Sequence, residues 1–235
     1  MKHTLLIKDW LSSFLSLLFP RCCVVCGRPL AKGEECICTV CNINLPRTNY
    51  HLRKDNPVER LFWGQIPLER ATSFFFYEKG SDFRLILHRL KYGGQKEIGA
   101  IMGRYMAAEL LSSNFFQGID VIIPIPLHKK KQQIRGYNQS EWIARGIAAV
   151  TGIPIDTESI LRKKNTETQT RKSVFERRDN VEGIFELQHP ETLAGKHILI
   201  VDDVLTTGST TLACASCLVN VEGIRISILT LATVE

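Results

Sequence analysis

Residues 197–211, HILIVDDVLTTGSTT, read as a buried strand, an acidic pair, a turn and the start of a helix. The mostly branched apolar run at 197–201 is typical of a parallel strand that is covered on both faces. Asp202 and Asp203 follow this run directly, so two carboxylates are expected at the carboxyl end of the strand. A helical pattern through 212–218 completes a strand–turn–helix unit, which favours an α/β protein.

Small and hydroxyl-bearing residues fill the turn before that helix. They are Thr206, Thr207, Gly208, Ser209 and Thr210. A helix N-terminus attracts anions through its free N–H groups and its dipole, and the hydroxyls add donors. The sequence therefore predicts a phosphate in the turn, with ribose hydroxyls or a divalent cation on the two carboxylates. The plainer alternative is a turn in which an Asp or Thr side chain only caps the helix.

The same stretch closely resembles the phosphoribosyl-diphosphate (PRPP) binding signature of type I phosphoribosyltransferases. Two other common phosphate-binding motifs, GxxxxGK[ST] and GxGxxG, do not occur in this sequence. The resemblance implies an α/β fold with an open parallel sheet and helices on both faces. Ligands of such sheets bind at the carboxyl ends of the strands.

Composition places the chain among ordinary globular proteins. It has 235 residues, 44% of them hydrophobic and 23% charged, enough for one α/β domain and a small appendage. The net charge is +6, and residues 128–178 alone contain twelve Lys and Arg against five Asp and Glu. This concentration of positive charge favours binding of phosphates, pyrophosphate or nucleic acid, and a solvated lysine-rich surface is the alternative.

Six of the eight cysteines lie between residues 22 and 41. Two Cys-x-x-Cys pairs can be drawn from them, Cys23/Cys26 and Cys38/Cys41. This spacing supplies four thiolates to a tetrahedral Zn²⁺, and Gly27 follows where the turn needs a positive φ. We therefore predict a structural zinc ion. Cys22 or Cys36 could replace a ligand, and an iron–sulfur cluster is the lesser alternative.

Three units are expected along the chain. Residues 1–20 read as an amphipathic helix, too short to span a bilayer, with a membrane-surface helix as the alternative. Residues 21–46 form the zinc-binding module, 47–57 read as a linker, and 60–235 form the phosphate-binding domain. No transmembrane segment or export signal is recognisable, so a cytoplasmic protein is expected.

A second strand–loop–helix unit precedes the first. Residues 120–126, DVIIPIP, predict a strand, 128–135 a basic loop and 138–150 a helix. The carboxyl ends of parallel strands share one edge of a sheet, so loops 128–135 and 202–210 are expected to face one crevice. Further elements are expected as a strand at 72–77 and helices at 82–90 and 95–111. The turn at 91–94 between these helices, with Lys91 and Arg89, could contact an anion, although a plain helix–helix turn is the alternative.

The segment Leu161–Gly183 is polar, basic and long for a simple connection. We predict a mobile lid over the crevice, and a disordered segment without function is the alternative. Four of its cations are available to phosphates: Arg171, Lys172, Arg177 and Arg178.

Further stretches resemble a single family. PIPLHKKKQQIRGYNQSEWIA (124–144), TETQTRKSVFERRDNVEGIF (166–185) and the cysteine pairs after an apolar N-terminal helix are similar to the ComF family. Its members are bacterial, competence-associated, phosphoribosyltransferase-like proteins. The resemblance spans essentially the whole chain. It implies a type I phosphoribosyltransferase-like fold with an N-terminal zinc-ribbon-like module, and a role with other DNA-uptake proteins in natural transformation. Some members are known instead through carbon-source utilisation.

Carried over by position, the resemblance implies roles for individual residues. Asp202 and Asp203 would take the ribose hydroxyls, and residues 206–210 the 5′-phosphate. The pyrophosphate, with Mg²⁺, would meet Leu127, His128, Lys129 and Lys130. Two prolines and a lysine run replace the usual small-residue loop there. The family's RG-aromatic-NQ element matches Arg135, Gly136, Tyr137, Asn138 and Gln139, in which the tyrosine could stack on a base or pack at the helix start.

Two functions remain open from the sequence. The favoured one is a binding protein that holds PRPP or a 5′-phosphorylated nucleotide and also single-stranded DNA. Its expected phosphate contacts are Lys129, Lys130, Lys131, Arg135, Arg171, Lys172, Arg177 and Arg178. The alternative is an active phosphoribosyltransferase that transfers phosphoribose from PRPP to an unidentified amine or base, with Asp203 as the candidate general base. No acceptor-specific motif is present.

Overall fold

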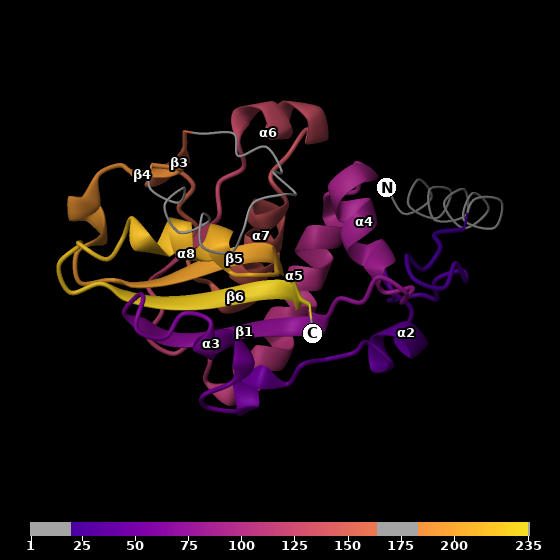
Figure 1. Cartoon of the computed structure of the whole chain (residues 1–235). Helices are drawn as coiled ribbons and strands as arrows, with labels where there is room; N and C mark the ends of the chain where they lie inside the picture. Colours follow the sequence, from indigo (N-terminus) through magenta and orange to yellow (C-terminus); the bar gives the residue numbers. More distant parts are fainter. Residues whose placement is uncertain (1–19, 164–182, 235) are drawn as a thin grey trace, which may run out of the picture.

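The computed structural model describes residues 20–163 and 183–234. Its centre is a four-stranded, all-parallel sheet with the strand order β1–β6–β5–β2 (Figure 1). Ile155 adds a parallel bridge to Ile122 at the free edge of β2. The strands of the sheet are β1 (Leu68–Phe76), β2 (Val121–Pro124), β5 (His197–Leu205) and β6 (Arg225–Thr233).

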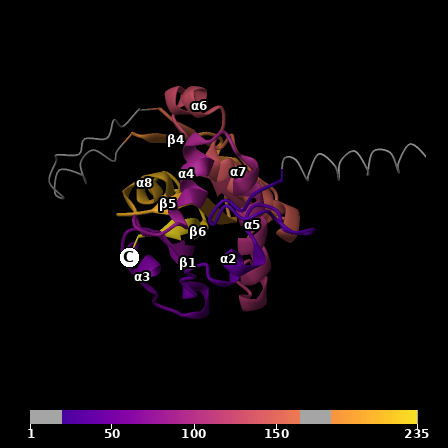
Figure 2. The same ribbon diagram turned by 90° about the vertical axis from the view of Figure 1, so that its right-hand side faces the viewer.

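Helices cover both faces of this sheet. Successive side chains of a strand point to opposite faces, and in β5 Leu199 and Val201 enter one hydrophobic cluster while Ile198 and Ile200 enter the other. Figure 2 shows α5 and α7 on one side of the sheet and α3 and α8 on the other. The predicted open parallel α/β sheet is therefore confirmed. The longer helices are α4 (Arg84–Tyr92), α5 (Glu97–Leu110), α6 (Lys129–Arg135), α7 (Gln139–Thr151) and α8 (Ser209–Ser216).

Shorter elements connect these parts. Antiparallel β3 and β4 form a small separate sheet at the two ends of the predicted lid. Residues 164–182 of that lid lie outside the described residues, as do residues 1–19 of the helix expected at residues 1–20. The short elements are α2 (Thr39–Ile43), η1 (Tyr50–Leu52), α3 (Pro57–Arg60), η2 (Leu111–Ser113), β3 (Ile160–Arg162), β4 (Phe185–Leu187) and η3 (Pro190–Leu193).

The acidic strand is longer than its apolar run. Backbone pairing of β5 with β6 continues past Val201, with Asp202 opposite Thr230 and Leu205 opposite Thr233. Pairing with this central neighbour extends the strand beyond its apolar run, as far as Leu205. Asp202 and Asp203 still lie in its carboxyl-terminal half.

The expected basic loop at 128–135 is a helix. His128 caps α6 by accepting a hydrogen bond at Nδ1 from the Lys130 N–H, 3.2 Å away, and Gly136 ends the helix at a φ of 80°. Lysine, glutamine and arginine favour helices, but this helix has little apolar periodicity and its Ile134 is 84% exposed. The loop prediction was wrong because the apolar periodicity by which a helix is recognised in a sequence is weak in this stretch.

Residues 47–57 are packed and do not form a linker. The Thr48 hydroxyl donates to the Ser73 carbonyl of β1. Asn56 is buried, donates from Nδ2 to the Ala71 carbonyl at 2.9 Å and caps α3. Polar residues in this stretch suggested solvent exposure, but they bond to the edge of the sheet. The linker prediction was therefore wrong.

None of the helices within residues 20–163 and 183–234 combines the length and apolar character that a membrane crossing requires.

Candidate functional site

The two aspartates of β5 are held by neighbouring groups. Asp202 accepts hydrogen bonds at Oδ1 from the Ser140 hydroxyl of α7, 2.9 Å away, and from the Asp203 N–H, 2.8 Å away. Asp203 pairs through Oδ2 with Nζ of Lys91 in the last turn of α4, at 3.0 Å. We call Asp202, Asp203 and Lys91, together with Arg162 of β3, the carboxylate site.

Burial and neighbouring charges shift the pKa values of two side chains in the carboxylate site, Asp202 and Arg162. Desolvation, and next the charge of Asp203, raise the pKa of Asp202 to about 7. Burial lowers the pKa of the Arg162 guanidinium, while the Asp202 charge acts in the opposite direction. A charged Asp202 is costly in free energy because it is desolvated. The site therefore favours a bound ion that stabilises this charge.

Further cations from α6 extend this site. Desolvation, and then the charges of Arg162, Arg135 and Lys91, lower the pKa of Lys131. Four cations from three elements thus lie close enough to influence one another. The sequence predicted Lys131 and Arg135 individually and proposed Lys91 as an anion contact, whereas Arg162 was not singled out because only its segment looked basic.

The turn between β5 and α8 leads into a helix start that no side chain of residues 20–163 or 183–234 caps. Gly208 has a φ of 74°, and a Cβ there would lie 3.3 Å from the Phe62 ring, so any other residue would be strained. Thr207 and Ser209 hydroxyls bond to each other at 2.8 Å. Within the described residues no side chain caps α8, so the plain capping alternative does not hold. The first N–H groups of this helix remain suited to an anion.

A cleft lies beside the carboxylate site. It is lined by three of the four residues that were expected to contact pyrophosphate. Leu127, His128 and Lys129 border a cavity of about 570 Å³ together with Arg162 of the carboxylate site. Lys130 is exposed on α6 and is not part of this lining. The four cations predicted in the lid, Arg171, Lys172, Arg177 and Arg178, lie outside the described residues.

The RG-aromatic-NQ element, residues 135–139, makes contacts that hold neighbouring helices together. Tyr137 is buried and donates its hydroxyl to the Leu90 carbonyl of α4 at 2.6 Å, so it packs and does not offer its ring to a base. Asn138 caps α7 and donates from Nδ2 to the Ile125 carbonyl at 3.0 Å. Arg135 bonds to the Gln139 amide oxygen at 2.8 Å. These contacts fix α4, α6 and α7 around the carboxylate site.

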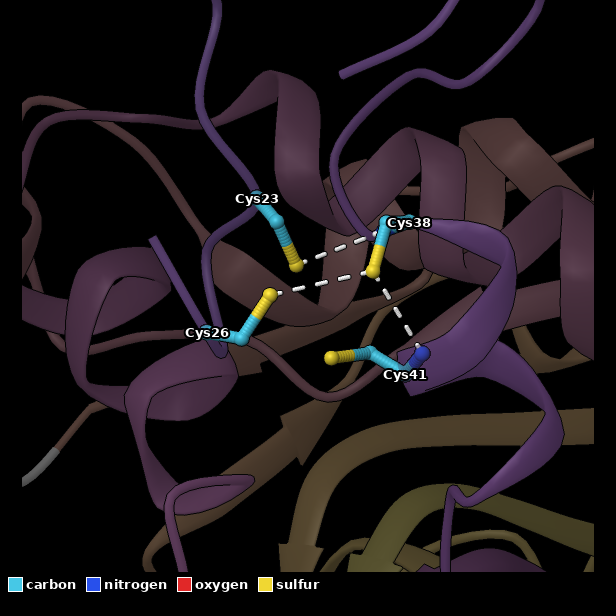
Figure 3. A group of neighbouring side chains, drawn as sticks. All are labelled: Cys23, Cys26, Cys38 and Cys41. Atoms are coloured by element: carbon cyan, nitrogen blue, oxygen red, sulfur yellow. Dashed lines mark hydrogen bonds between the residues drawn. The ribbon is translucent and has the colours of Figure 1, made fainter. Parts of the chain in front are cut away.

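The four predicted cysteines converge on one point. The sulfur atoms of Cys23, Cys26, Cys38 and Cys41 lie within 4.8 Å of one another and point toward a common centre (Figure 3). Cys26 and Cys38 sulfurs are 3.7 Å apart, close to the edge of about 3.8 Å of a tetrahedron with Zn–S bonds of about 2.3 Å. These four side chains could hold a metal ion such as zinc.

Local geometry favours the thiolate form at one ligand. Burial opposes ionisation of Cys23, but hydrogen bonds from the backbone, including Cys26 and Cys38, outweigh it and lower the pKa of this thiol to about 7. The φ of 73° at Gly27 confirms the turn expected after the first pair. Cys38 also begins α2, where its sulfur accepts from the Cys41 N–H.

The two spare cysteines lie away from the cluster. Cys22 is exposed and its thiol donates to the Pro20 carbonyl. Cys36 is buried 3.9 Å from the Met102 sulfur of α5, and desolvation raises the pKa of its thiol to about 12. Cys36 therefore ties the cysteine segment to α5, a tie reinforced by the ion pair between Glu35 and Arg104.

Comparisons with known proteins support this picture. A model of the phosphoribosyl transferase domain matches residues 139–234. The DNA utilization protein YhgH of Escherichia coli O157:H7 is 32% identical over 209 residues, which cover 83% of this chain and 88% of that protein. Competence protein ComFC of Bacillus subtilis (strain 168) is 26% identical over 214 residues, with coverages of 89% and 82%. Competence protein F of Haemophilus influenzae is 31% identical over 130 residues, with coverages of 54% and 57%. The chain belongs to the ComF family of phosphoribosyltransferase-like proteins.

Proposed function

We propose that this protein binds PRPP, or another ligand with a 5-phosphoribosyl group, at the carboxylate site and the 206–210 turn. One observation carries the proposal: two half-buried carboxylates lie just before an uncapped helix N-terminus, with Lys91, Lys131 and Arg162 nearby. Such a set offers acceptors to a diol and donors to phosphates at adjacent positions.

In this proposal each part of the ligand meets a different group. The 5′-phosphate accepts hydrogen bonds from the backbone of Gly208 and Ser209 and from the hydroxyls of the turn. The ribose hydroxyls donate to Asp202 and Asp203, and Lys91 exchanges its ion pair for a phosphate. Mg²⁺ would be held by a carboxylate together with the ligand's pyrophosphate, because it prefers oxygen ligands and substrate phosphates.

The second part of the proposal is that a basic surface on α6, formed by Lys129, Lys130, Lys131 and Arg135, binds single-stranded DNA during DNA uptake. Lys129 and Lys130 are exposed at the start of α6, half-buried Lys131 follows them, and Arg135 is the last residue of the helix. The names of the relatives, which refer to DNA utilization and competence, support this role. A cytoplasmic location and partners among DNA-uptake proteins belong to the same proposal.

The cysteine cluster has a structural part in this function. The four thiolates would fill every position of a tetrahedral Zn²⁺, so the ion stabilises the fold and leaves no position for a substrate. We further propose residues 21–46 as the metal module and 60–235 as the phosphoribosyltransferase-like domain.

An active phosphoribosyltransferase is the second candidate. The pKa of about 7 at Asp202 is the observation that favours it, because such a carboxyl can exchange a proton near neutral pH. In that reaction an amine or base attacks the ribose C1, the bond from C1 to pyrophosphate breaks, and the proton of the acceptor passes to a carboxylate. Asp203, the base expected from the sequence, is instead paired with Lys91.

A combined assay separates the two candidates. The full chain is mixed with PRPP and Mg²⁺, pyrophosphate release is followed with a panel of amines and bases, and single-stranded DNA is titrated at two salt concentrations. The binding function predicts no turnover and an affinity for DNA that falls steeply with salt. Charge reversal at Lys129, Lys130 and Lys131 should abolish that DNA binding. Turnover that disappears in Asp203→Ala would instead establish the enzyme.

A further inference from the structure

A serine hydroxyl of α7 is directed at the carboxylate site. Ser140 is only 4% exposed, and its hydroxyl donates to Oδ1 of Asp202 at 2.9 Å. The two residues are 62 positions apart in the sequence, so the fold brings them together. A buried hydroxyl needs some partner, and this bond alone assigns no role to the serine. The hydrogen bonds around it show that the contact belongs to a larger arrangement.

Hydrogen bonds hold Ser140 and Asp202 in a closed ring. The Ile125 N–H donates to the Val201 carbonyl at 2.9 Å, where the chain leaving β2 still pairs with β5. The Ile125 carbonyl accepts from Nδ2 of Asn138 at 3.0 Å, and Oδ1 of Asn138 accepts from the Ser140 N–H at 3.2 Å. The Ser140 hydroxyl closes the ring on Asp202, the residue after Val201. The start of α7 is therefore fixed relative to the acidic pair of β5.

This ring fixes the orientation of the Asp202 carboxylate. Oδ1 accepts from the Ser140 hydroxyl and also from the Asp203 N–H at 2.8 Å. Both bonds end on the same oxygen, so neither donor occupies Oδ2, which has lone pairs for a ligand hydroxyl. Two donors on one oxygen restrict rotation of the side chain, so Oδ2 keeps one direction. A carboxylate that is held in place before the ligand arrives loses less conformational entropy on binding.

The Ser140 hydroxyl also stabilises the charge that makes Asp202 a strong acceptor. Desolvation, and then the charge of Asp203, raise the pKa of Asp202. The hydrogen bonds from the Asp203 N–H and from Ser140 oppose this rise, followed by the charge of Lys91. A charged carboxylate accepts a stronger hydrogen bond from a hydroxyl than a neutral carboxyl does. Both effects of Ser140, on direction and on charge, act through Asp202.

We propose that Ser140 is a positioning residue, which aims Oδ2 of Asp202 at a hydroxyl of the bound sugar. It thereby gives the site a preference for a sugar phosphate over a bare phosphate. In the proposed function the 206–210 turn binds the phosphate, so loss of the Ser140 hydroxyl should weaken the contacts to the sugar alone. The inference rests on that function, because it assumes a 5-phosphoribosyl ligand at the carboxylate site.

Calorimetry on the full chain tests this role with two probes, ribose 5-phosphate and inorganic phosphate. Ser140→Ala should bind ribose 5-phosphate about tenfold more weakly, as expected for loss of a hydrogen bond to a charged group, and inorganic phosphate as the wild type does. Alanine favours a helix more than serine does, so the variant should fold. Ser227→Ala is the matched control, because it removes another buried serine hydroxyl, which is hydrogen-bonded to Nε2 of His197 at 2.9 Å. It should bind both probes like the wild type.

A double-mutant cycle tests whether Ser140 acts through Asp202. In the Asp202→Asn background, Ser140→Ala should change the affinity for ribose 5-phosphate by less than about twofold, because the carboxylate that it positions is gone. A full tenfold loss in that background, an unchanged affinity of Ser140→Ala alone, or an equal loss for inorganic phosphate would overturn the inference and leave the proposed function standing. A wild type that does not bind ribose 5-phosphate would overturn both.

Discussion

The two polar centres of this protein are assembled in different ways. The cysteine cluster takes all four sulfurs from residues 23–41, a short stretch of the chain. The carboxylate site joins Lys91 of α4, Ser140 of α7, Arg162 of β3 and the acids of β5, which lie far apart in the sequence. The first centre is set by local spacing and the second by the topology of the sheet. We therefore expect metal removal to affect mainly stability and charge changes to affect mainly ligand binding.

The largest effect should come from the cysteine cluster. Cys38→Ser removes a ligand that also begins α2, so zinc should be lost and the free energy of unfolding should fall by more than about 4 kcal/mol. Elemental analysis and thermal unfolding check both results. Cys22→Ser, at an exposed sulfur outside the cluster, is the matched control and should keep metal and stability. A Cys38→Ser protein with full stability would show that the cluster is not structural.

Next comes the pH dependence of the carboxylate site. The folded pKa of about 7 at Asp202 lies above the unfolded value of about 3.9, so its contribution to stability is complete below about pH 3.9 and is lost as pH rises to 7. The asparagine of Asp202→Asn does not ionise, so this variant should not lose stability in that way as the pH rises. Urea unfolding should therefore find the variant about 4 kcal/mol more stable, relative to wild type, at pH 8 than at pH 4. Glu222→Gln, at an exposed acid, should show no such change, and parallel curves for Asp202→Asn and wild type would contradict the account.

The turn offers a comparison between two glycines. Gly208→Ala and Gly152→Ala both place alanine at a positive φ, of 74° and 73°, and each should cost about 1–2 kcal/mol of stability. Only the Gly208 variant approaches the Phe62 ring and the expected phosphate. Calorimetry should therefore show at least tenfold weaker binding of ribose 5-phosphate for Gly208→Ala and unchanged binding for Gly152→Ala. Equal affinities would remove the phosphate from the turn.

The smallest effect concerns Tyr137. Tyr137→Phe removes the hydrogen bond to Leu90, which should cost about 0.5–1.5 kcal/mol in chemical denaturation. Because the ring is buried, affinity for single-stranded DNA should not change in fluorescence titrations. A loss of DNA affinity at unchanged stability would restore the stacking role.

Local patterns predicted a large part of this molecule. The cysteine pairs, the apolar run of β5 and the turn at Gly27 each depend on residues that are close in sequence, and the structure has them as expected. Long-range contacts were not accessible in the same way. Helix α6 lacks an apolar face, and 47–57 looks solvated until its side chains meet β1. Arg162 reaches Asp202 only through the β3–β4 hairpin, which no local signal marks.

Calorimetric titration of PRPP with Mg²⁺ into the full chain and into the Asp202→Asn/Asp203→Asn double variant tests the central claim most directly. We predict saturable binding to the wild type and at least a hundredfold weaker binding to the double variant, which keeps the size of both side chains while removing their charge. Equal affinity for the two proteins, or no binding to the wild type, would contradict the proposed phosphoribosyl site.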